Sequence, residues 1–204
     1  YEVLTDQILN ISNADGMSIY SLENNELTFR IMKTRSFNYH AGGTSDKKID
    51  FQPLPLFNDD GSKNHAAMST HAALTAKPIV IDDCYDSDEF DFSGAKQFDS
   101  ENGYRTKAMV TIPIIDYTDT AQGVMQIINP MDFESGDLIS FNDDIIADLQ
   151  NFNRHVGSYI SQKRLLVEVE NMFEALILLI ARAIDKKSHY TGKHCERVPI
   201  LTKM

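Results

Sequence analysis

The sequence predicts an α+β fold, in which an antiparallel sheet is flanked by helices and followed by a long C-terminal linker helix. Three observations lead to this fold class. β-Branched segments occur in pairs joined by tight polar connections, and apolar residues at helical spacing occur before, between and after them. The chain from Asn142 to Val198 contains no proline. Strand pairs joined by short connections, with helices before, between and after them, are typical of an antiparallel sheet with helices packed against it.

The first predicted elements are a helix and a hairpin. Apolar residues recur at helical spacing over residues 3–11, and the Asn-Ala-Asp-Gly segment at 13–16 predicts a turn. Two strands are predicted at 17–22 and 26–34. Residues 23–25, Glu-Asn-Asn, form the short polar connection that is typical of a hairpin.

The middle of the chain is less regular. We expect an irregular segment at 36–63, which contains adjacent glycines and two prolines, and then a helix at 64–76 with a face of small residues. A strand is predicted at 78–82. It is followed by an acidic loop, whose carboxylates are best interpreted as solvated because calcium ligands at fixed spacing around a glycine turn are missing. Residues 90–102 form a mixed segment.

The last predicted strands are 107–115, which we expect Pro113 to break, and 123–129. Residues 116–122 connect them as a second hairpin. The pattern then becomes helical, and either one long helix or two nearly continuous ones are expected over residues 143–184.

Composition excludes several classes of function. The chain has 204 residues, a hydrophobic content of 42% and a charged content of 24%, which are ordinary values for a globular protein. Its formal net charge of −11 repels nucleic-acid phosphates, so no nucleic-acid partner is expected. No apolar run reaches about 18 residues, so we expect no membrane insertion. Two cysteines far apart in the sequence fit a reducing cytoplasm.

Four segments, in order, resemble the successive signature segments of a GAF domain. They are Asp15–Tyr20, Lys77–Asp83, Gly103–Ile114 and Gly123–Asn129. The resemblance covers residues 1–160, and the order of several short motifs is more specific than any one of them. It implies a small-molecule-sensing or dimerising module of a signal-transduction protein. It also implies a pocket between the sheet and a lid, here residues 84–102.

Five residues are predicted to bind a small-molecule ligand: Phe98, Asp99, Arg105, Thr106 and Met109. An arginine and a hydroxyl at the entrance of a strand can hold a carboxylate or a phosphate. Further wall residues are Phe92, Thr111, Met125 and Ile127. For each single wall residue an ordinary core position is the preferred interpretation, because such residues are usually buried.

The resemblance leaves the ligand open. Cyclic-nucleotide-binding GAF domains have an Asn-Lys pair after the last strand, whereas this chain has Asn129-Pro130. Their closing helix begins with a phenylalanine and an acidic pair, which lies closer to Phe141 here.

Three cofactor or enzyme alternatives remain beside a cyclic nucleotide. His65 and His71 could hold haem, but two histidines on a solvated helix face are the preferred interpretation. A bilin could attach through Cys84, although we expect an unreactive thiol beside the acidic loop. A GAF-type sulfoxide reductase needs a second, resolving cysteine, and residues 1–160 contain none. No cofactor is therefore expected in this domain.

Residues 183–198 resemble the opening of an HD-GYP phosphohydrolase domain, through Asp185, Thr191, His194 and the Arg197-Val198 pair. The resemblance implies a parent enzyme that hydrolyses cyclic di-GMP with iron or manganese ions, and it makes His194 a metal ligand. The defining His-Asp and Gly-Tyr-Pro motifs do not occur in the 204 residues. We therefore expect this chain to be non-catalytic.

The helix before that segment carries a four-three apolar repeat, formed by Leu165, Val169, Met172, Leu176, Leu179 and Ala183. It predicts a homodimer through the C-terminal helix. The predicted organisation is a GAF domain at 1–160, a linker helix at 161–184 and the start of a hydrolase domain at 185–204. The combined prediction is a bacterial, cytoplasmic sensory module. The alternative is a ligand-free structural module that only dimerises.

Overall fold

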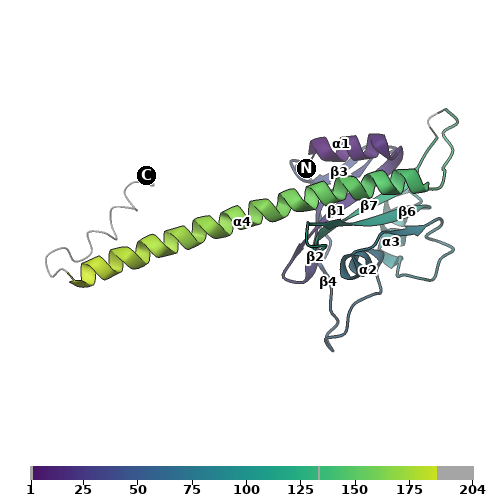
Figure 1. Ribbon diagram of the computed structural model, residues 1–204. Helices are drawn as coiled ribbons and strands as arrows, with labels where there is room; N and C mark the ends of the chain where they lie inside the picture. Colours follow the sequence, from purple (N-terminus) through teal and green to yellow (C-terminus); the bar gives the residue numbers. More distant parts are fainter. Residues whose placement is uncertain (1, 133, 188–204) are drawn as a thin grey trace. The chain divides into compact units, whose positions relative to one another are not determined.

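The computed structural model describes residues 2–132 and 134–187, as Figure 1 shows. Its helices are α1 (Glu2–Ile11), α2 (Met68–Thr75), α3 (Ser93–Asn102) and α4 (Asp143–Lys187). Its strands are β1 (Ala14–Glu23), β2 (Glu26–Thr34), β3 (Tyr39–Gly42), β4 (Leu54–Pro55), β5 (Ile79–Ile81), β6 (Met109–Ile115) and β7 (Ala121–Pro130). The predicted α+β class, with a long C-terminal helix, is confirmed.

The strands form one sheet in the order β3-β2-β1-β7-β6-β5, and β4 pairs with β2. Every pairing between them is antiparallel. The predicted first hairpin is present, since β1 and β2 pair in antiparallel register. Asn24 and Asn25 in its turn both have positive φ angles, of 51° and 63°. Two such residues suit a tight turn whose twist matches that of the flanking strands.

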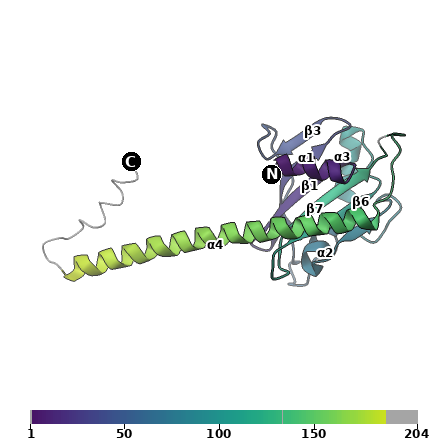
Figure 2. The same cartoon turned by 45° about the horizontal axis from the view of Figure 1, so that its top comes forward.

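Helices cover both faces of the sheet, as Figures 1 and 2 show. On one face, α1 and the first part of α4 enclose the largest core cluster, which includes Leu9, Ile19, Ile112, Ile127 and Leu149. On the other face, α2 and the segment leading into α3 pack over two smaller clusters. Alternation along each strand therefore divides its side chains between two layers.

Several expected boundaries are corrected by the structure. The segment 36–63 contains β3 and β4, the helix expected from residue 64 begins at Met68, and the mixed segment 90–102 contains α3. Asp15 and Gly16, expected in a turn, belong to β1.

Pro113 does not break its strand, because β6 continues through it to Ile115. The neighbouring strand β5 pairs only with residues 109–111 of β6. The ring of Pro113 and its missing N–H therefore lie where no ladder bond to β5 is required.

The chain divides into two compact units, Tyr1–Ile160 and Ser161–Met204. Within the first unit, Leu149 is buried and Ile145, Phe152 and Val156 pack against the core of the sheet. In the described part of the second unit, the large apolar side chains of α4 are exposed, from 42% at Leu178 to 67% at Met172.

Candidate ligand-binding site

A cavity of about 380 Å³ lies on the α2/α3 side of the sheet. Its floor comes from β1, β2, β6 and β7. Its walls come from residues 51–54, the start of α2 and residues 91–98. Its size falls within the roughly 300–1,000 Å³ that small-molecule sites occupy.

The centre of the floor is polar. In the sheet register Ser18 of β1 and Thr111 of β6 both lie opposite Gln126 of β7. The Gln126 amide nitrogen donates to Thr111 Oγ1 at 3.2 Å, and its oxygen accepts from the hydroxyl of Tyr20. Burial raises the pKa of Tyr20, so its hydroxyl stays protonated and acts as the donor. The orientation of the Gln126 amide is thus set by two neighbouring strands.

The rest of the cavity lining is mainly apolar. Tyr20, Phe29 and Phe51 form a chain of aromatic rings, with centroids 4.2 and 5.1 Å apart along it. Phe98 lines another part of the cavity and contacts Tyr39 edge to face. Four methionines are among the lining residues, and three of them, Met32, Met68 and Met109, lie outside the α1/α4 core, to which the Met17 side chain belongs. Thioether side chains are flexible and polarisable, so such a lining adapts to the shape of an apolar ligand.

Three of the five predicted binding residues, Phe98, Thr106 and Met109, line the cavity. Asp99 and Arg105 are not among its lining residues. The structure therefore brings the predicted apolar residues and the hydroxyl together, and places the two predicted charged residues beside the cavity instead.

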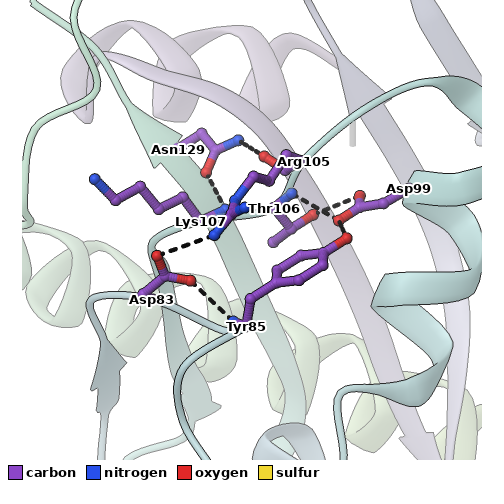
Figure 3. A network of polar contacts seen from close by, with 7 residues as sticks. All are labelled: Asp83, Tyr85, Asp99, Arg105, Thr106, Lys107 and Asn129. Atoms are coloured by element: carbon purple, nitrogen blue, oxygen red, sulfur yellow. Dashed lines mark hydrogen bonds and ion pairs between the residues drawn. The ribbon is translucent and has the colours of Figure 1, made fainter.

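Asp99 is buried and holds the strand entrance in place (Figure 3). Its carboxylate accepts from the Thr106 backbone N–H at 2.7 Å, from Thr106 Oγ1 at 2.9 Å and from the Tyr85 hydroxyl at 2.9 Å. These three bonds join α3 to the residues before β6 and to the acidic loop. Charge-assisted bonds of this kind stabilise a buried carboxylate without a cation.

Arg105 lies at the surface, with 59% of its side chain exposed. Its guanidinium carbon lies 4.6 Å from the centroid of the Tyr85 ring, and its Nη2 lies 3.4 Å from Asp83 Oδ2. A backbone hydrogen bond from Tyr85, together with the charge of Arg105, lowers the pKa of Asp83. Arg105 therefore already has an anionic and an aromatic partner outside the cavity (Figure 3).

Asn129 has a structural role in the same region. Its side-chain oxygen accepts from the Lys107 backbone N–H at 2.8 Å, and its amide donates to the Arg105 carbonyl at 2.8 Å and to the Tyr104 hydroxyl at 2.7 Å. Tyr104 in turn donates to the buried Asp15 at 2.7 Å. The side chain of Asn129, in the Asn129-Pro130 pair, is thus already hydrogen-bonded to the main chain before β6.

The residues considered for cofactors lie away from the cavity lining. His65 and His71 contact each other, with ring centroids 4.7 Å apart, and neither lines the cavity. Cys84 is buried, and its burial, with the charges of Asp83 and Asp99, raises the pKa of its thiol to about 12. A thiol with so little thiolate at neutral pH is a poor nucleophile.

No cluster of three or more His, Cys, Asp or Glu side chains suited to a metal ion occurs within residues 2–132 and 134–187. His194, the predicted metal ligand, lies outside the described residues. Across the same described ranges, none of the helices is long and apolar enough to cross a membrane.

Two polar residues of the cavity were not predicted from the sequence, and two residues considered for its wall lie elsewhere. Met125 and Ile127, for which both the cavity wall and an ordinary core were open, belong to the core between the sheet and α1/α4. Ser18 and Gln126 lie in the cavity and were not predicted. Gln126 itself could have indicated the polar floor. A single amide side chain among the apolar residues of a buried strand needs a hydrogen-bond partner on the same face of the sheet.

Comparisons with known proteins agree with this geometry at the level of the fold. No family model matches the chain. Over 64 residues, 31% of this chain, it is 39% identical to a dual 3′,5′-cyclic-AMP and -GMP phosphodiesterase 11 of Drosophila melanogaster, of whose length those residues span 4%.

Solved structures give the wider coverage. The GAF domain/HD domain protein from Geobacter sulfurreducens matches with a TM-score of 0.53 and 11% identity, over 80% of this chain and 91% of that one. The GAF domain region of a protein from Geobacter sulfurreducens PCA matches with a TM-score of 0.52 and 12% identity, over 78% and 89%. The seven-stranded antiparallel sheet with helices on both faces is therefore a GAF-like fold.

Proposed function

We propose that the chain is a regulatory module, in which a small molecule bound in the cavity controls an attached hydrolase through α4. The observation that carries the proposal is the cavity itself. It combines an oriented amide on the floor with apolar walls formed by segments from both halves of the domain. Concave, mostly apolar sites with a few fixed polar groups are the usual form of ligand pockets.

In this proposal the signal leaves the domain through a homodimer formed by α4. The five seam residues from Leu165 to Leu179 are between 48% and 67% exposed in the single chain. Their four-three spacing is that of a paired helix, and an apolar stripe of this length is costly to leave in water. Small shifts of paired helices are a known way to carry a signal between domains.

We further propose that the controlled enzyme is an HD-GYP phosphodiesterase for cyclic di-GMP in the bacterial cytoplasm. The support is the sequence at 183–198, most of which lies outside the described residues. Iron or manganese ions would activate water there, and His194 would be one ligand. Assays of the 204-residue chain with cyclic di-GMP and added manganese should detect no hydrolysis. Turnover that survives repurification and is lost in His194→Ala would contradict this.

The sensing function is tested by filling the cavity. We expect members of a metabolite set to raise the melting temperature of the unmodified chain, because a ligand that binds only the folded state stabilises it. Ser18→Phe places a ring on the cavity floor and should abolish those shifts. The matched control is Ser100→Phe, which changes an exposed residue of α3 outside the cavity and should keep them.

A ligand-free module that only dimerises is the competing proposal, favoured by the exposed stripe on α4. It would be supported if no compound shifts the melting temperature while the chain sediments as a dimer. Shifts that are equal in the unmodified chain and in Ser18→Phe would place binding outside the cavity and would also contradict the sensing proposal.

A further inference from the structure

We propose that the cavity selects an uncharged, planar ligand with a carbonyl or amide edge, and discriminates against carboxylates and phosphates. This inference rests on the proposed sensing function and narrows the chemical class of its ligand. It follows from the ion pairs and positions of the charged residues around the cavity, from the orientation of the Gln126 amide and from the aromatic walls.

Lys33 is among the residues that line the cavity, but its ammonium group lies on the opposite face of the sheet, where it pairs with Asp6 of α1. In the β1/β2 register it pairs with Met17, whose side chain belongs to the core under α1 and α4. Its ammonium group lies 2.5 Å from a carboxylate oxygen of Asp6 on α1. The sheet therefore separates this cation from a ligand resting on the floor.

The other charged lining residue is an anion. Asp91 stands at an exposed position, and hydrogen bonds from Ser93 lower its pKa, so it is ionised at neutral pH. Its charge repels an anionic ligand in the cavity that it helps to line. Arg105 does not offset this, because it lies outside the lining with Tyr85 and Asp83 as its partners.

An anion in this cavity would lose its hydration without gaining a cation. Transferring an unpaired ionised group out of water is strongly unfavourable, whereas a neutral carbonyl needs only one good hydrogen bond. The net charge of −11 adds a long-range repulsion of the same sign. The local and the global electrostatics therefore favour neutral ligands.

The polar edge of the ligand is specified by Gln126. Tyr20 and Thr111 fix the amide at both ends, and the remaining contact of its nitrogen is Met109 Sδ at 3.5 Å. A thioether is a weak acceptor, so a ligand carbonyl can take its place. Ser18, opposite Gln126 in the register, supplies a hydroxyl that can donate or accept.

The planar body follows from the walls. Phe29, Phe51 and Phe98 present rings to the cavity, and the methionines adapt around them. Flat apolar groups gain from offset or edge-to-face contacts with such rings. Sugar phosphates gain little from them.

The test compares two probes of nearly the same shape, 1-naphthamide and 1-naphthoate, with the full 204-residue chain. Calorimetric titration at neutral pH should show naphthamide binding at least about tenfold more tightly, which corresponds to about 1.4 kcal/mol. Cyclic GMP and cyclic di-GMP, which carry phosphate charges, should not compete with it.

Two variants locate the preference. Gln126→Leu should weaken naphthamide while leaving apolar naphthalene binding intact, and Met32→Lys should reverse the order of the two probes by adding a cation to the floor. Lys33→Gln is the control and should leave the ratio unchanged. Circular dichroism checks that each variant folds. If Met32→Lys fails to fold, Ser18→Lys replaces it.

The outcomes separate the two proposals. Naphthoate or cyclic GMP binding as tightly as naphthamide, and competing for the same cavity, overturns the charge preference but leaves the sensing function standing. A loss of binding in Lys33→Gln shows that Lys33 acts on the ligand and also overturns the preference. If neither probe nor any neutral compound of a wider set binds, the sensing function fails, and the ligand class fails with it.

Discussion

The two parts of α4 both carry apolar residues at helical spacing, but only the first part buries them. Before residue 160, Leu149 is only 1% exposed and its apolar neighbours pack on the sheet. After residue 160, Phe173 and Leu179 are 62% and 67% exposed. Apolar periodicity therefore predicts that one face of a helix packs against another surface. It does not distinguish a surface in the same domain from one in another molecule. Burial in the folded domain separates residues that stabilise the domain from residues available for assembly.

The largest expected effect is on the proposed homodimer and leaves the GAF-like domain folded. Val169→Glu combined with Leu176→Glu places like charges across the proposed seam, and the dimer should weaken at least about a hundredfold. Sedimentation velocity at several concentrations measures this. Asn171→Glu adds a charge to the same helix away from the seam and should leave the dimer intact. A monomeric unmodified chain, or a dimeric double variant, would refute the seam.

The next effect concerns the buried part. Asp99→Ala leaves the Thr106 backbone N–H and two hydroxyls without their acceptor, so the free energy of unfolding should fall by about 2–4 kcal/mol. Asp83→Ala, in the same network but paired with an exposed arginine, should cost about 1 kcal/mol or less. Urea unfolding followed by circular dichroism gives both values. Equal losses would show that burial does not set the importance of these carboxylates.

A smaller effect tests the contact between α4 and the sheet. A Cβ at Gly157 would lie 2.1 Å from the carbonyl oxygen of Ile115. Gly157→Ala should therefore destabilise the domain by about 1–3 kcal/mol, although helix propensity alone favours alanine by about 1 kcal/mol. Gly94→Ala, where no atom lies within 4 Å of the added Cβ, is the matched control and should be neutral or slightly stabilising. A stabilised Gly157→Ala chain would exclude the close contact.

The smallest effect concerns the exposed ion pair between Arg154 and Asp119, at 2.7 Å, in which both side chains are more than half exposed. Arg154→Gln should change the free energy of unfolding by about 0.5 kcal/mol or less, because water screens such pairs. Adding salt should reduce even that difference. A loss comparable with that of Gly157→Ala would mean that polar surface contacts, rather than close packing, hold α4 on the sheet.

Local signals in the sequence were sufficient for most of the fold. The hairpin at Asn24-Asn25, the strands around Val110 and Gln126, and the uninterrupted α4 follow from turn chemistry and periodicity. The short strands β3 and β4 were missed, because they pair only with β2 and carry little pattern of their own. Element order and type were thus more predictable than short edge segments.

The site was less predictable, because it depends on which face of each strand a residue occupies. Phe98, Thr106 and Met109, predicted as binding residues, line one cavity, whereas Met125 and Ile127, for which wall and core were both open, lie in the core on the other side of β7. If the register of a strand is shifted by one residue, every side chain of that strand moves to the other face of the sheet. The contacts of Arg105 with Tyr85 and Asp83 depend on the path of a loop. That path cannot be predicted from the periodicity of the sequence.

The approach of Gly157 to Ile115 also bears on how motion travels through the domain. Most helices rest on a sheet through side chains, which can change rotamer and absorb a displacement of a few tenths of an ångström. Here the main chain of α4 lies directly against the carbonyl at the end of β6. Strand β6 also carries Met109 of the cavity floor. We therefore expect a movement of that strand to displace the helix directly, because no side chain that could change rotamer lies between them at this contact.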